Sequence, residues 1–209
     1  MRLAGPMALL MLLAALLLAG CGNVPGVPDH TYFRMSKPQQ LPRSEKPVFV
    51  DPIVVGLFEA NGLYADRALI YALDPAAEEL RQFHYQLWTD PPTRLLQRRL
   101  QIELREANMA PLVIQALAAI PGAVRISGEI LRFERVPTPE GGHIASVVLR
   151  LRADRPDGTP LTNEIYHADV PTADKRLISA TAAMFTAVDQ IFVEFHADLI
   201  KSQELEHAR

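Results

Sequence analysis

The sequence predicts one α+β domain, in which a mainly antiparallel sheet is packed by two long helices. The first helix is indicated by an amphipathic segment that begins at Asp90-Pro91 and runs to about Ala107. Residues 124–170 contain three strand-like segments joined by short turns, a pattern typical of an antiparallel meander. A second helical pattern, with an apolar side chain every three or four positions, extends from about Asp174 to Ser202. Packed together, these elements make a single domain.

The first 20 residues predict a lipoprotein signal peptide. Arg2 gives a basic start, and an apolar run from Ala8 to Ala19 follows, which is short of the ~20 residues that a membrane-spanning helix needs. Leu18-Ala19-Gly20-Cys21 then resembles the bacterial lipobox, whose cysteine is lipidated and becomes the mature N-terminus. We predict lipidation of Cys21, the only cysteine in the chain. The alternative is an incidental cysteine in an uncleaved anchor.

Residues 21–47 are predicted to be a lipidated, proline-rich tether ahead of the domain. Proline fixes φ and removes a backbone donor, so this stretch is expected to be extended and poorly packed. Tyr32-Phe33-Arg34-Met35 interrupts it with strand-prone residues and is an edge-strand candidate. The prolines of the predicted tether are Pro25, Pro28, Pro38, Pro42 and Pro47.

The domain is predicted to span residues 48–203, before a short tail at 204–209. Its first half contains three strand candidates. Residues 48–55 are rich in β-branched side chains, and Pro52 among them should mark an edge or a bulge. A loop over residues 56–65 precedes a second strand at 68–73. The third, at 82–88, alternates apolar and polar residues and is predicted to be half buried.

In the first helix, a leucine stripe is expected to face the core. Leu96, Leu100 and Leu104 lie four residues apart and therefore share one face. Five charged residues are predicted to cover the other side of this helix. They are Arg94, Arg98, Arg99, Glu103 and Arg105. Residues 109–120, which follow, are compatible with either a short strand or a helix.

The second half opens with the clearest strand, residues 124–136, in which the apolar phase switches near Ile130. This switch predicts a bulge or burial on both faces. Strands at 145–153 and 161–170 follow after two glycine-containing turns, and the long helix ends the domain.

Composition and motifs argue against several functions. The formal net charge of −3 gives no basic excess for nucleic acid. With Cys21 acylated, no thiol is left for a disulfide, a thiolate metal site or a nucleophile. The six histidines show no metal-ligand spacing, and neither G-x-S-x-G nor G-x-G-x-x-G occurs. We therefore predict no catalytic residue, metal or cofactor, and a protein that is not an enzyme. A site assembled in space from distant residues stays open.

Several aromatic side chains cluster between residues 58 and 88, where they either pack in the core or form a docking or lipid-contacting surface. Core packing is favoured for those on strands. Tyr64 and Trp88 are at loops or strand ends, which makes them interface candidates. The cluster comprises Phe58, Tyr64, Tyr71, Phe83, Tyr85 and Trp88.

From Tyr32 onward, the order of these features resembles the ABC-type transport auxiliary lipoprotein family. The resemblance rests on loose motifs that cover nearly all of the mature chain. They are Tyr32-Phe33-Arg34-Met35 after the tether, Leu63-Tyr64-Ala65-Asp66-Arg67 before Ile70-Tyr71, Tyr85-Gln86-Leu87-Trp88-Thr89-Asp90-Pro91-Pro92 at the helix start, and Leu131-Arg132-Phe133.

The resemblance implies a non-enzymatic accessory lipoprotein of an MCE-type ABC lipid transport system. Such a protein would be held in the outer membrane by acyl chains such as palmitate on Cys21, would face the periplasm, and would dock or anchor the periplasmic MCE-domain protein. Gly22 rather than aspartate after Cys21 is similar to outer-membrane lipoproteins. Tyr64, Arg67 and Trp88 are the expected partner interface, and a homo-oligomer is left open.

Two other functions compete with this hypothesis. One is an envelope lipoprotein that acts as an activator or assembly factor for a cell-wall or outer-membrane machine. The other is an envelope hydrolase with an unrecognised site.

Overall fold

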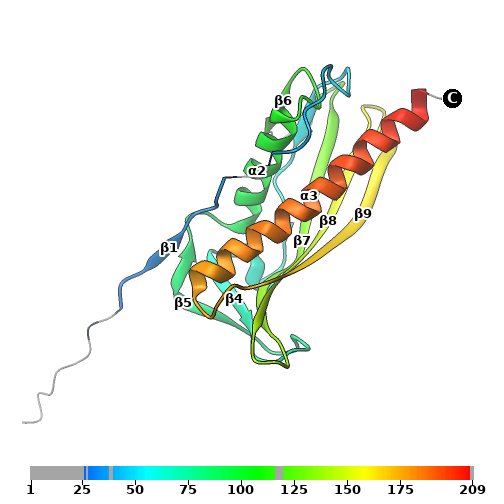
Figure 1. Cartoon of the computed structure of the whole chain (residues 1–209). Coiled ribbons are helices and arrows are strands. Elements are labelled where there is room, and N and C mark those ends of the chain that lie inside the picture. The colour runs from blue at the N-terminus through cyan, green and yellow to red at the C-terminus, as the bar shows by residue number, and fades with distance from the viewer. Residues whose placement is uncertain (1–25, 27, 38–39, 116–119, 208–209) are drawn as a thin grey trace, which may run out of the picture.

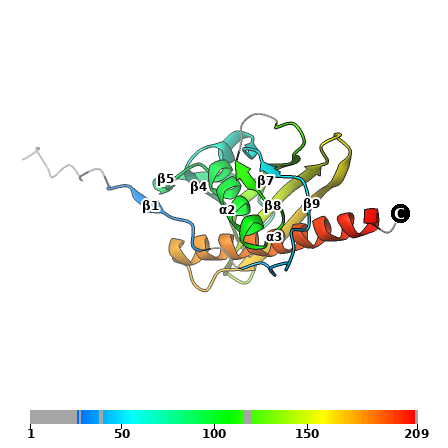
Figure 2. The same cartoon turned by 90° about the horizontal axis from the view of Figure 1, so that it is seen from above.

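The computed structural model describes residues 26, 28–37, 40–115 and 120–207. Cys21 and the predicted signal peptide lie outside these residues. The described chain forms one α+β domain, in which a curled nine-stranded sheet is covered by the helices α2 (Pro92–Glu106) and α3 (Leu177–His207) (Figures 1 and 2). The predicted fold class, with two helices in a single domain, is therefore confirmed.

Strand β7 (Val124–Pro137) is the centre of the sheet. Along one edge it pairs with β8 (His143–Asp154), which in turn pairs with β9 (Pro160–Pro171), both antiparallel. Along its other edge, three short strands pair with it in parallel and in chain order. They are β2 (Ile53–Val55), β3 (Glu59–Ala60) and β4 (Ala68–Ala72).

The remaining strands extend the sheet outward from these short strands. β6 (Val113–Gln115) pairs with β2 in parallel. β5 (Leu80–Trp88) forms an antiparallel hairpin with β4, and β1 (Thr31–Phe33) lies parallel to the end of β5. The 3-10 helix η1 (Gly62–Ala65) connects β3 to β4.

The prediction of a mainly antiparallel sheet is wrong, because five of the eight strand pairings in the described part of the chain are parallel. The antiparallel pairs join neighbours in sequence through tight turns, which leave a local signal. The parallel pairs bring together distant segments, such as Ile53 opposite Val124, and nothing in either segment specifies the partner. The sheet is mixed for this reason.

Within the meander, the predicted strands and bulge are confirmed. The register between β7 and β8 shifts between Ile130 and Arg132, where the apolar phase of the sequence switches. In the ambiguous segment 109–120, Val113–Gln115 is a strand, while residues 116–119 lie outside the described part.

Both helices begin later than predicted. The N-cap of α2 is Pro91 and not Asp90, whose carboxylate instead lies 3.4 Å from the guanidinium of Arg98. Before α3, the Asp174 carboxylate accepts a hydrogen bond from the backbone N–H of Arg176. α3 continues past Ser202 to His207, into the segment predicted to be a tail.

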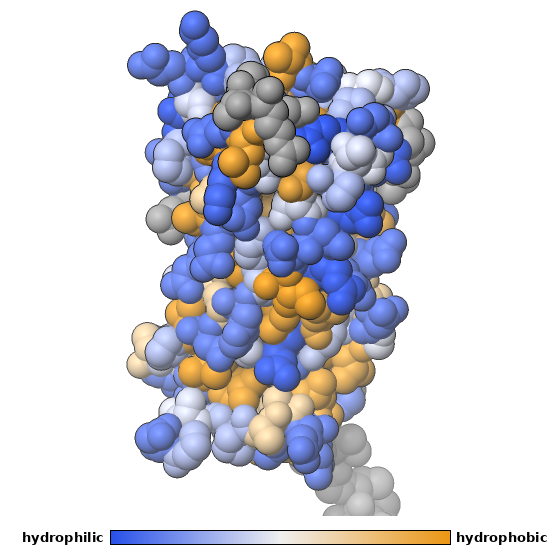
Figure 3. Space-filling view, turned by 90° about the vertical axis from the view of Figure 1, so that its right-hand side faces the viewer, coloured by the Kyte–Doolittle hydropathy of each residue, from blue (hydrophilic) through white to orange (hydrophobic). Residues whose placement is uncertain are grey.

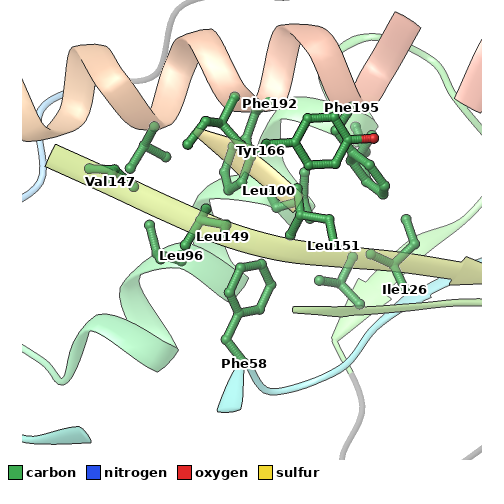
Figure 4. Close-up of a cluster of buried hydrophobic side chains, with 14 of the residues drawn as sticks. Phe58, Leu96, Leu100, Ile126, Val147, Leu149, Leu151, Tyr166, Phe192 and Phe195 are labelled. Carbon is green, nitrogen blue, oxygen red and sulfur yellow. The ribbon is translucent and has the colours of Figure 1, made fainter. Parts of the chain in front are cut away.

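The core lies between the helices and β8 (Figure 4). Phe192 and Phe195 from α3 and the leucine stripe of α2 converge on the alternating residues of β8. α3 has the length and composition of a membrane span, but half of that stretch is buried in this domain. It is therefore a core helix here. The buried residues of β8 are Ala145, Val147, Leu149, Leu151 and Ala153.

The end of the predicted tether makes contacts with the domain, although residues 42–43 and 45–47 are exposed. Leu41 is buried, and the backbone N–H of Ser44 donates to the carbonyl of Ala107 at 3.0 Å. Arg43 donates to the carbonyl of Glu106. These contacts satisfy carbonyl groups that the end of a helix leaves free.

Figure 3 shows the face that lies on the right of Figure 1. Hydrophilic side chains dominate it, and the hydrophobic ones form separate patches.

Candidate functional site

Arg67 joins three strands at one corner of the sheet. It directly precedes β4, and its backbone carbonyl accepts from the N–H of Trp88 at the end of β5, at 2.6 Å. Its side-chain Nε donates back to the carbonyl of Trp88 at 3.0 Å. The guanidinium carbon also lies 5.2 Å from the centre of the Tyr32 ring on β1, which is a cation–π distance. Arg67 thus fastens the edge strand β1 to the β4–β5 hairpin.

Trp88 lies inside the domain, because the strand end that carries it is covered by α3. Its side chain is 1 % exposed, and its ring packs against Phe33, Phe133 and Phe185, with centroids 5.4 to 6.5 Å apart. These partners come from β1, β7 and α3. The indole predicted to meet a partner is therefore part of the core and has no exposed surface with which to dock.

Tyr64, on η1, covers a buried carboxylate. Its hydroxyl donates to Glu134 of β7, which is 1 % exposed, and Nε of Arg132 lies 3.5 Å from Oε1 of the same residue. Burial raises the pKa of Glu134, and burial together with the bond to Glu134 raises the pKa of Tyr64. The tyrosine stays protonated and donates, while its half-exposed ring remains at the surface.

Of the three predicted interface residues, the structure joins only Arg67 and Trp88. Among the described residues, no hydrogen bond or ring contact links Tyr64 to either of them. Tyr64 and Arg67 nevertheless lie within three positions of each other around the start of β4, and both are accessible. The surface around η1 and the start of β4 is therefore the part of the predicted site that a partner can reach. Cys21 lies outside the described residues.

A buried charge cluster between the helices is a feature of the structure that the sequence did not predict. Arg99 of α2 has no exposed side-chain surface, and its Nε donates to Oδ1 of Asp189 on α3 at 2.9 Å. One of its terminal nitrogens donates to the backbone carbonyl of Ser36 at 2.8 Å. Arg99 therefore ties α2 both to α3 and to the segment that follows β1.

Glu103 belongs to this cluster but is held neutral. Its Oε1 lies 3.0 Å from Nε of Arg99, but neither carboxylate oxygen accepts a hydrogen bond with acceptable geometry. Burial raises the pKa of Glu103 to about 8, and the negative charge of Asp189 adds to this. The attraction to Arg99 is too weak to reverse the shift. At neutral pH the cluster therefore carries one cation, Arg99, and one anion, Asp189.

The prediction that Arg99 and Glu103 face solvent is wrong, because the buried face of α2 is wider than its leucine stripe. Each precedes a core leucine, Leu100 or Leu104, by one position. Their i, i+4 spacing between leucines was the available sign of a pair turned inward.

The side chains of Arg67, Trp88 and Arg99 hold elements of the fold together. Tyr64 and Arg67 are in addition accessible. Within residues 26, 28–37, 40–115 and 120–207, no group of three or more His, Cys, Asp or Glu is placed to hold a metal ion. The absence of catalysis stays a prediction.

Comparisons with known proteins add the following. The family model described as "ABC-type transport auxiliary lipoprotein component" matches residues 38–194. A crystal structure of a Xanthomonas campestris protein assigned to DUF330 has a TM-score of 0.73 at 14% sequence identity, covering 86% of this chain and 100% of that one. An uncharacterized protein has a TM-score of 0.60 at 11% identity, covering 82% of this chain and 99% of that one. Both show the fold alone. No curated protein matches the chain.

The PelC dodecamer from Paraburkholderia phytofirmans is also similar, with a TM-score of 0.42 at 11% identity, covering 72% of this chain and 93% of that one. A likeness at this level carries no conclusion about assembly.

Proposed function

The chain belongs to the ABC-type transport auxiliary lipoprotein family, and on this premise we propose that it is the accessory lipoprotein of an MCE-type ABC lipid transport system. In this role it acts from the periplasmic side of the outer membrane and docks or anchors the periplasmic MCE-domain protein, without catalysing a reaction. The observation that carries the proposal is the family match over residues 38–194.

Cys21 supplies the membrane attachment in this proposal. Each buried acyl CH₂ contributes ~0.8 kcal/mol, and stable anchoring takes more than one chain. With a net charge of −3, the protein has no polybasic excess that could substitute for acyl chains on an anionic surface. Replacing Cys21 with serine should therefore release the protein from the membrane fraction, which fractionation of cells measures directly.

The docking surface in this proposal lies around η1 and the start of β4. Tyr64 and Arg67 are accessible there, whereas the buried Trp88 supports the surface from within through its backbone bonds to Arg67. Arginine and tyrosine are enriched among interface residues.

Photocrosslinking in intact cells tests the function and the surface together. A photoreactive residue is placed at Arg67, and a control at Leu205, which is 58% exposed near the opposite end of α3. The proposal expects an MCE-domain protein crosslinked from position 67 and little or none from position 205. Capture of a cell-wall synthase or barrel-assembly protein instead would favour the activator or assembly-factor hypothesis. A self-adduct would reveal the homo-oligomer.

A further inference from the structure

An open groove of about 600 Å³ runs along β5. We call it the β5 groove, and its lining includes two groups of side chains. The apolar members include Leu63, Tyr71 and Phe83, with the rings of the last two 4.4 Å apart. The polar members include Arg81, on the same face of β5 as Phe83, and His84 with glutamine side chains on the other face, because side chains alternate along a strand. Apolar and hydrogen-bonding groups thus line the same groove.

Arg81 gives the β5 groove a positive charge in an acidic protein. No aspartate or glutamate lines the groove, and Arg81 is its single permanently charged side chain. Arg81 is exposed, and within the described residues no carboxylate forms an ion pair with it. A guanidinium that is free to form two parallel hydrogen bonds is suited to a phosphate group.

The path of the chain places this groove near the predicted anchor. β1 covers only residues 86–88 of β5, so the edge of residues 81–85 carries no strand in the described part of the chain. Because β1 and β5 are parallel, the chain upstream of Thr31 leads toward the start of β5, and the ring of His30 lies 5.6 Å from that of Tyr85. Ten peptide steps separate Cys21 from Thr31, which span at most ~35 Å.

Only one end of the domain can lie this close to the anchor. α3 has 31 residues and is therefore ~46 Å long, and it runs from the end that carries β4 and β5 to the opposite end (Figure 1). If acyl chains on Cys21 hold the protein in a membrane, the end with β5 is therefore the end that the tether keeps within reach of it. Tyrosine is enriched at the membrane–water interface, where one side of the ring is apolar and the other is wet.

We propose that the β5 groove binds a phospholipid of the membrane that holds Cys21. Arg81 contacts the phosphate, His84 and the glutamines contact the polar headgroup, and Leu63, Tyr71 and Phe83 contact the glycerol and the start of the acyl chains. The inference rests on the proposed anchorage through Cys21 but requires no MCE partner.

The test uses the full-length lipidated protein in vesicles of phosphatidylethanolamine and phosphatidylglycerol that contain a phospholipid with a photoreactive headgroup. Intact mass first verifies acylation, so that failed anchorage is told apart from an empty groove. After irradiation, peptide mapping should place the lipid adducts on residues 80–86. Arg81→Gln should reduce these adducts roughly tenfold, the order expected for the loss of one charge-assisted contact, and Arg81→Lys should retain part of them.

The matched control is Arg105→Gln, which removes an exposed arginine from the last turn of α2 and should leave the adducts unchanged. Adducts spread evenly over the domain, or reduced equally by both glutamine variants, would overturn the proposal. So would loss of the adducts on adding inorganic phosphate, since the site would then bind free phosphate. Two results together would assign the groove to protein docking instead. They are no adducts on residues 80–86 in the vesicles with the reactive lipid, and protection of the same residues by a protein partner in vesicles without it.

Discussion

Replacing Arg99 with methionine should destabilise the domain far more than the same change one position earlier. Methionine keeps an unbranched side chain in the space between α2 and α3 but removes the cation. Asp189, whose side chain is 13% exposed, then keeps its negative charge without a partner, and the carbonyl of Ser36 loses its donor. Breaking a buried ion pair from one side costs ~3–5 kcal/mol, mostly because the remaining charge is left in a poorly solvated site.

Arg98 provides the matched control. Its side chain is 55% exposed, and its contact with Asp90 is 3.4 Å long. An exposed pair of this kind contributes ~0–1 kcal/mol, so Arg98→Met should change the free energy of unfolding by no more than that. Urea unfolding followed by circular dichroism measures both variants. With a slope of ~2 kcal/mol per M of urea, Arg99→Met should lower the midpoint by ~2 M and Arg98→Met by less than ~0.5 M.

A double variant separates the stranded charge from simple loss of packing. Arg99→Met combined with Asp189→Leu removes both charges and should recover most of the lost stability, because apolar replacement of a whole buried pair is often neutral. Equal losses for Arg99→Met and Arg98→Met would refute the reasoning. So would a double variant whose loss of unfolding free energy equals the sum of the losses of Arg99→Met and Asp189→Leu measured separately. The unpaired charge of Asp189 would then not be the cause.

Three further changes test other parts of the structure. Glu103→Gln should flatten the pH dependence of the free energy of unfolding. The pKa of Glu103 in the folded protein, about 8, lies above the ordinary 4.5, so the stability from the protonated group is complete below pH 4.5 and is lost as pH rises toward 8. Urea midpoints across that range measure the effect. Trp88→Ala should cost ~3–5 kcal/mol of unfolding free energy, against a much smaller loss if the indole lay at the surface. Gly128→Ala should cost ~1–3 kcal/mol by the same assay, because a Cβ there would lie 2.5 Å from the Phe58 ring; an unchanged midpoint would contradict this close contact.

Local patterns in the sequence were sufficient for the elements whose partners are neighbours. The meander of β7, β8 and β9 was predictable because each turn joins strands that pair with each other. The long apolar stripe of α3 indicated its burial for a similar reason, since the period of the side chains alone defines the face. Even the bulge near Ile130 follows from one switch in phase.

The candidate site was predictable only in part, because burial depends on what lies above a residue. Trp88 ends a strand, which made it an interface candidate, yet Phe185 of α3 packs on it from almost a hundred positions away. Tyr64 lies at a loop, as expected, but its carboxylate partner Glu134 belongs to a distant strand. Arg99 was predicted to face solvent because the periodicity of one helix does not show that Asp189 of the facing helix accepts its hydrogen bond.

The sequence by itself determined the α+β class, the two helices, the antiparallel meander and the prediction of a lipidated Cys21, since each is written in a run of consecutive residues. Only the tertiary structure decided the parallel pairings along β7, the buried ion pair of Arg99 and Asp189, and the β5 groove with its single cation. Periodicity specifies which face of an element is apolar. It does not specify which other element covers that face, because pairing between distant segments is fixed by the packing of the whole chain.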